Sequence, residues 1–101
     1  MSGLYIDGKW RSGQGPELLS TDPATGEIVW REATAGEADV AEAVAAGHRA
    51  FPDWADRPRE ARIAVLRRYK EILVERTAAF AEALSRETGK ALWETLSLIH
   101  I

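Results

Sequence analysis

Glu87-Thr88-Gly89-Lys90 is the stretch that decides most about the fold, because it closes a long helical region. A glycine just past a helix can adopt the left-handed conformation that lets the last carbonyl groups find donors, and a lysine suits the negative end of the helix dipole. Upstream of this stop, the sequence predicts three helices, with a break near residues 75–77. A fourth helix is expected to start near Ala91 to Glu94.

The first helix is predicted from a start signal, an apolar stripe and a stop. Thr34-Ala35-Gly36-Glu37 has the form of a capping box, which places the helix start at Thr34. Gly47 falls within the stripe, so we expect it to let another backbone approach closely. Pro52 is expected to end this helix, and Pro58 suits the first turn of the next one. The stripe consists of Val40, Ala43, Val44, Gly47 and Phe51.

Short strands are predicted over residues 4–33, ahead of helices over about residues 35–95. Asp7-Gly8 lies between β-forming residues and predicts a hairpin. A second pair of extended segments flanks the turn Asp22-Pro23-Ala24-Thr25-Gly26. Nothing resembles the buried parallel strands on which such helices usually pack. We therefore expect an α/β fold that is incomplete: a hairpin and strands followed by three to four helices.

Composition narrows the classes of function. The 101 residues suit one small domain, and the net charge of −3 with interspersed basic residues argues against nucleic-acid binding. No apolar run is long enough to span a membrane, and the first residues do not form a signal peptide, so we expect a cytoplasmic protein. The absence of cysteine excludes disulfides, thiolate zinc sites and a cysteine nucleophile from these residues.

Candidate chemical groups are weak throughout. A phosphate-binding loop needs a strand before it and a helix N-terminus after it, but Pro16 and more extended chain follow Gly13-Gln14-Gly15, so a surface loop is the better interpretation. His48 and His100 have no partner at a metal-binding spacing. The acidic residues, including Glu37, Asp39 and Glu42, suit solvated helix faces and caps. The sequence therefore gives no catalytic, cofactor-binding or metal residue.

The order and spacing of several strings resemble the N-terminal region of the NAD(P)-dependent aldehyde dehydrogenases. The resemblance covers residues 4 to about 95, although Ala91 stands where many members have proline after the lysine. It implies part of a Rossmann-type cofactor-binding domain with a scaffold role. The strings are the Asp-Gly hairpin, Asp22-Pro23-Ala24-Thr25-Gly26-Glu27, Ala50-Phe51-Pro52-Asp53-Trp54, Arg62-x-x-x-Leu66-Arg67 and Glu87-Thr88-Gly89-Lys90.

The resemblance also implies the chemistry of a longer parent enzyme. In such enzymes a cysteine thiolate attacks the aldehyde, hydride passes to NAD or NADP, and a glutamate-activated water releases the acid. The groups for these steps have no matching position here, so this segment is expected to bind no cofactor and to be inactive alone. The implied partners are the remainder of the polypeptide and an aldehyde, namely N-succinylglutamate 5-semialdehyde of bacterial arginine catabolism. The full-length enzyme is expected to be a homo-oligomer.

The last six residues, 96–101, depart from the family pattern. Leu96-Ser97-Leu98-Ile99-His100-Ile101 resembles one reading frame of a sequencing adapter, so we expect the native segment to cover residues 1–95. A genuine apolar tail is the alternative. A different class of function also stays open, which is a stand-alone helical module that docks on a partner through its apolar stripes.

Overall fold

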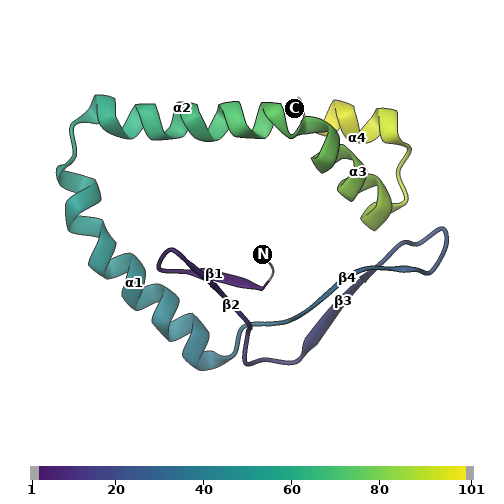
Figure 1. Ribbon diagram of the computed structural model, residues 1–101, viewed down its shortest axis with the longest axis horizontal. Coiled ribbons are helices and arrows are strands. Elements are labelled where there is room, and N and C mark those ends of the chain that lie inside the picture. The colour runs from purple at the N-terminus through teal and green to yellow at the C-terminus, as the bar shows by residue number, and fades with distance from the viewer. Residues whose placement is uncertain (1–2, 100–101) are drawn as a thin grey trace. The chain divides into compact units, whose positions relative to one another are not determined.

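The structure, a computed structural model, describes residues 3–99 as four short strands followed by four helices (Figure 1). The chain divides into two units, one built from residues up to Leu19 with Trp30–Pro58, the other from Ser20–Val29 with residues from Arg59 onward. The elements are β1 (Leu4–Ile6), β2 (Lys9–Arg11), β3 (Glu17–Thr21), β4 (Ile28–Ala33), α1 (Glu37–Asp56), α2 (Arg59–Glu75), α3 (Thr77–Thr88) and α4 (Leu92–Ile99).

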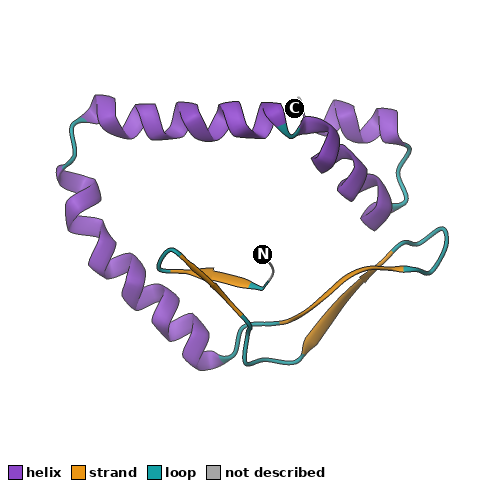
Figure 2. Cartoon of the chain, in the orientation of Figure 1, coloured by secondary structure: helices purple, strands orange, loops and turns teal. Residues whose placement is uncertain are grey.

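The first unit begins with the predicted hairpin. β1 and β2 pair antiparallel, with Ile6 opposite Lys9, so that Asp7 and Gly8 alone form the turn (Figure 2). Asp7 has φ 52° and Gly8 has φ 77°, which is the left-handed pair that a tight hairpin turn requires. The sequence prediction is confirmed. The second strand pair, β3 with β4, is joined by the expected turn, in which the Asp22 amide donates to the Glu27 carbonyl at 2.9 Å.

Two predictions about the limits of α1 were wrong. The helix starts at Glu37 with Gly36 as its N-cap, while the Thr34 hydroxyl donates instead to the Pro16 carbonyl at 2.7 Å. Pro52 does not end the helix, which continues through it to Asp56. A proline inside a helix leaves one carbonyl, here that of His48, without its usual donor. Residues 47–56 are exposed, so water can satisfy that carbonyl.

The second unit contains the predicted break and stop. α2 ends at Glu75 and α3 starts at Thr77, where the Thr77 hydroxyl donates to the Val74 carbonyl at 2.8 Å. Gly89 caps α3 with φ 73°, and its amide donates to the Ser85 carbonyl at 2.9 Å. α4 then packs beside α3. The predicted fourth helix is confirmed, and it continues across the expected boundary at Thr95.

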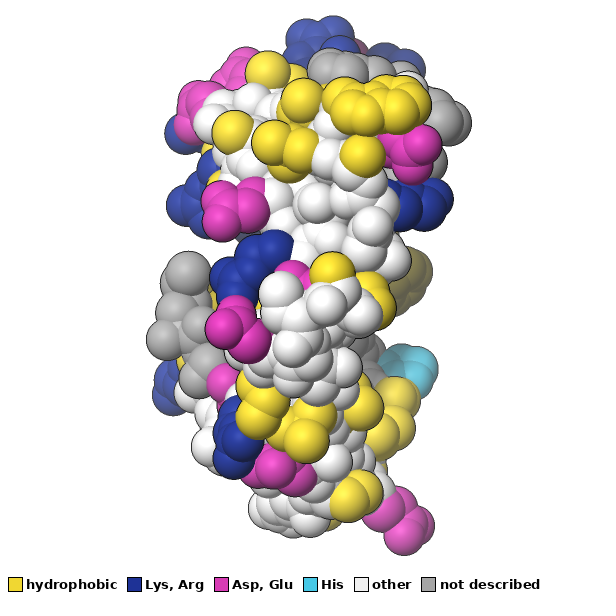
Figure 3. Space-filling model, turned by 90° about the vertical axis from the view of Figure 1, so that its right-hand side faces the viewer, with side chains coloured by type: hydrophobic (Ala, Val, Ile, Leu, Met, Phe, Trp, Pro, Cys, Tyr) yellow, Lys and Arg dark blue, Asp and Glu magenta, His cyan; other side chains and the backbone are white. Residues whose placement is uncertain are grey.

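Very little apolar surface is buried among the described residues. Ala46 of α1 and Ala81 of α3 are the buried hydrophobic residues, and α2 has no buried residue. Large apolar side chains lie exposed on α1, α2, α3 and α4, among them Phe51 at 66% and Trp93 at 72%. Figure 3 shows hydrophobic side chains, in yellow, on one face of the molecule. This agrees with the expectation that each helical stripe requires a further layer of structure.

Gly47 does not do what its place in the stripe predicted. A Cβ atom added there would meet nothing within 4 Å among the described residues. The space beside Gly47 on α1 is therefore open, and no other backbone in residues 3–99 comes within 4 Å of the added atom.

Candidate functional site

A cluster of polar groups in the first unit lies where the loop after β2 meets the start of α1. Asp39 stands at the third position of α1 and is only 1% exposed. One carboxylate oxygen accepts from the amides of Gly36 at 2.9 Å and Gln14 at 2.8 Å, and the other accepts from Arg11 Nη2 at 3.0 Å. A second guanidinium nitrogen of Arg11 donates to Glu42 at 2.6 Å. We name these residues (Arg11, Gln14, Gly36, Asp39 and Glu42) the Asp39 cluster.

The electrostatics of this cluster follow from its hydrogen bonds. The amides of Gly36 and Gln14, together with the Arg11 guanidinium, lower the pKa of Asp39, although burial of the carboxyl group acts in the opposite direction. The hydrogen bond to Glu42 is the largest cause of a raised pKa for Arg11. Asp39 is therefore held as a buried carboxylate with three donors.

The prediction that Asp39 is a solvated helix charge was wrong. Its burial depends on Arg11 and Gln14, which lie 28 and 25 residues away in sequence. A local signal was present, since an acidic residue three positions after Gly36 fits the second half of a capping box. The Thr34-x-x-Glu37 pattern begins two residues before Gly36, and the helix start was therefore predicted too early.

The Gly13-Gln14-Gly15 loop does not fit a nucleotide phosphate. The Gln14 amide donates a hydrogen bond to Asp39, and the Gly15 amide donates one to the Thr34 carbonyl at 2.8 Å. A Cβ atom at Gly13 would come 2.0 Å from that same carbonyl oxygen, so this chain itself fills the space beside the loop. The Asp39 carboxylate already accepts the hydrogen bond from the Gln14 amide, which a phosphate bound in this loop would need. The segment is a loop, as predicted, and it packs against Thr34; that it binds no phosphate stays a prediction.

No group of three or more His, Asp or Glu side chains in residues 3–99 is placed to hold a metal ion. His48 lies on α1 with Val44, Gly47 and Phe51 around an open groove of about 460 Å³. His100 lies outside the described residues. No helix in the described part of the chain is long and apolar enough to cross a membrane.

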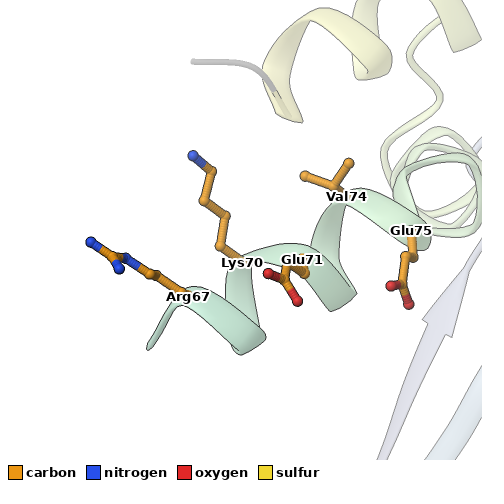
Figure 4. Close-up of a pocket in the computed structure, with 5 residues that line it drawn as sticks. All are labelled: Arg67, Lys70, Glu71, Val74 and Glu75. Atoms are coloured by element: carbon orange, nitrogen blue, oxygen red, sulfur yellow. The ribbon is translucent and has the colours of Figure 1, made fainter. Parts of the chain in front are cut away.

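A shallow groove of about 540 Å³ on α2 carries charge but does not form a site (Figure 4). All of its lining residues belong to this one helix, and their side chains spread in different directions. Arg68 also pairs with Glu71 at 3.2 Å and with Glu75 at 3.3 Å, so exposed ion pairs already use these acids. The lining residues are Arg67, Lys70, Glu71, Val74 and Glu75.

The arrangement of strands and helices in residues 3–99 is that of a known protein family. Residues 10–100 match the model of the aldehyde dehydrogenase family, so this chain belongs to the aldehyde dehydrogenase family. The prediction made from the hairpin, the turns and the helix stop is confirmed.

Particular relatives sharpen the comparison. The chain is 77% identical over 93 residues to N-succinylglutamate 5-semialdehyde dehydrogenase 2 of Caulobacter vibrioides, which covers 92% of this chain and 19% of that protein. N-succinylglutamate 5-semialdehyde dehydrogenase of Burkholderia mallei is 49% identical over 94 residues, and the match covers 93% of this chain and 19% of that protein. This chain therefore spans about a fifth of the length of these relatives.

Solved structures show the same fold. An NAD-dependent benzaldehyde dehydrogenase from Corynebacterium glutamicum superposes with a TM-score of 0.89 at 27% identity, over 95% of this chain and 21% of that one. A putative methylmalonate-semialdehyde dehydrogenase from Sinorhizobium meliloti, complexed with NAD, gives 0.83 at 35% identity, over 92% and 19%.

Proposed function

We propose that this chain is a scaffold segment of an NAD(P)-dependent aldehyde dehydrogenase that oxidises N-succinylglutamate 5-semialdehyde to the acid. The observation that carries the proposal is the 77% identity to an enzyme of that name over almost the whole chain. The pathway would be bacterial arginine catabolism, and the location the cytoplasm. The stand-alone module gains no comparable support.

The catalytic and cofactor-binding residues belong, in this proposal, to the remainder of the polypeptide. The sequence holds no cysteine to act as the thiolate nucleophile. In the glycine-containing loop of the first unit, the amides of Gln14 and Gly15 already donate to Asp39 and Thr34. Residues 1–95 would position the cofactor domain by packing their exposed apolar faces on that remainder, and a homo-oligomer would form only at full length. Residues 96–101 would be an adapter translation.

The test begins with the gene. Sequencing the locus from the organism shows whether the reading frame continues past Thr95 toward a cysteine and a glutamate. The resulting full-length protein is then assayed for NADH or NADPH formation with N-succinylglutamate 5-semialdehyde. We expect saturable turnover, which replacement of the downstream cysteine by serine abolishes.

Two comparisons make the assay specific. Succinate semialdehyde serves as the control substrate, and we expect a lower kcat/KM for it because it lacks the N-succinyl amino-acid portion. The 101-residue chain serves as the control protein, with no turnover expected. A stop codon directly after Ile101, together with a stable folded 101-residue monomer, would overturn the proposal.

A further inference from the structure

Three segments of the first unit converge on one carboxylate. Asp39 accepts from Arg11 at the end of β2, from Gln14 in the following loop and from Gly36 at the cap of α1. These partners lie 28, 25 and 3 residues from Asp39. Charged acceptors form stronger hydrogen bonds than neutral ones, so a single ionised group supports all three segments.

The loop that Asp39 holds packs closely against the segment before α1. Added Cβ atoms would fall 2.0 Å from the Thr34 carbonyl oxygen at Gly13 and 2.6 Å from the Thr34 hydroxyl at Gly15. Two neutral backbone bonds accompany this close approach, from Gly15 to Thr34 at 2.8 Å and from Thr34 to Pro16 at 2.9 Å. These two bonds join only the loop and the segment before α1, whereas Asp39 also binds β2 through Arg11.

We propose that Asp39 is a carboxylate latch that holds the β1–β2 hairpin and its following loop on the first turn of α1. Loss of its negative charge frees this arm and leaves α3 and α4 folded. The latch goes beyond the proposed catalytic function, because it is a conformational device of this segment and involves no substrate.

In the part of the chain that the structure describes, the charged groups bonded within the latch come from β2 and α1. On β2 the facing charge is Arg11, and on α1 it is Glu42, one turn after Asp39. The loop and the cap contribute the neutral amides of Gln14 and Gly36. Arg49 pairs with Asp7 at 3.5 Å at the hairpin turn, where both side chains are exposed. When Asp39 is protonated, Arg11 still has Glu42 but the two amides lose their anionic acceptor.

Hydrogen–deuterium exchange of the 101-residue chain, read by mass spectrometry, tests the latch. In Asp39→Asn we expect exchange in peptides covering residues 9–16 to rise about tenfold, because hydrogen bonds to a charged group are lost. Peptides from α3 and α4 should be unchanged. The matched control Glu42→Gln removes a more exposed partner of the same arginine, and its exchange should stay within about threefold of wild type.

A pH series separates a latch from a merely structural role. We divide each exchange rate by that of an unstructured peptide at the same pH. The wild-type arm should open as the pH falls below the ordinary aspartate value of 3.8, whereas the Asp39→Asn arm should be equally open throughout. Should Asp39→Asn fail to fold, Arg11→Gln removes one donor and should open the arm less. Unchanged exchange at residues 9–16, or an equal rise in α3 and α4, would overturn the proposal.

Discussion

Pro23 lies directly against Gly89: a Cβ atom added at Gly89 would come within 2.8 Å of the Pro23 Cγ atom. Pro23 belongs to the turn between β3 and β4, and Gly89 caps α3 with φ 73°. Gly89 therefore meets two requirements at once, a left-handed backbone and the absence of a side chain beside the proline ring. Two strings that carry the family resemblance meet at this contact.

Gly89→Ala should destabilise the second unit by more than the about 1–2 kcal/mol that a left-handed alanine alone costs. The excess comes from the contact with Pro23, so Pro23→Ala should recover part of the loss in the double variant. Urea unfolding followed by circular dichroism measures the free energies. Strict additivity of the two substitutions would show that the contact contributes nothing.

Two glycines of the first unit should respond in opposite directions to alanine. Gly47→Ala should stabilise α1 by about 0.5–1 kcal/mol, because the site is an open helix position where alanine has the higher propensity. Gly13→Ala should destabilise, since its methyl group would overlap the Thr34 carbonyl. Thermal unfolding of both variants checks this. A stabilising Gly13→Ala would contradict the close packing of the loop.

Stability should fall in acid through Asp39. Because the folded-state pKa is lowered, the unfolded chain binds the proton first. The contribution is therefore complete above 3.8, the ordinary value, and is lost as the pH falls through the lowered value. The stability difference between wild type and Asp39→Asn should shrink over this range. A difference that is constant with pH would contradict the expectation, and Glu42→Gln is the matched control.

The exposed apolar faces should govern association of the 101-residue chain. Phe51→Ser should change the free energy of unfolding by less than about 0.5 kcal/mol, because the ring is largely exposed, but it should reduce self-association. Ala81→Ser is the control, since Ala81 is fully buried and its loss should destabilise the chain. Analytical ultracentrifugation and urea unfolding separate the two effects. Equal association of wild type and Phe51→Ser would count against a role for this face.

Features encoded by adjacent residues were predictable from the sequence. The residues of Asp7-Gly8 themselves favour the hairpin turn, and Gly89 itself favours the left-handed end of a helix, so both were predicted correctly. Pro52 misled because its cost depends on whether water can reach the freed carbonyl, which is a property of exposure that a local pattern does not contain.

The Asp39 cluster could not be predicted from local sequence patterns either, because its partners are distant in the sequence. Arg11 and Asp39 are separated by a strand pair and a turn, and nothing in either neighbourhood identifies the other as its partner. The same holds for Gly47, whose place in the stripe predicted a neighbour that the described residues do not supply. Periodicity and turn chemistry therefore did not predict which residues far apart in the sequence contact each other.

The Asp39 cluster also has a consequence for the order of folding. Its bonds lie within residues 11–42, so they can form without any contribution from α2, α3 or α4. α2 buries none of its residues, so its helix gains tertiary support only when another layer covers it. We expect the hairpin, its loop and the first turn of α1 to be protected earliest in pulse-labelled refolding, with α2 protected later. Protection of α2 first would contradict this order. In the expected order, folding of residues 3–99 starts at the Asp39 cluster and not at an apolar core.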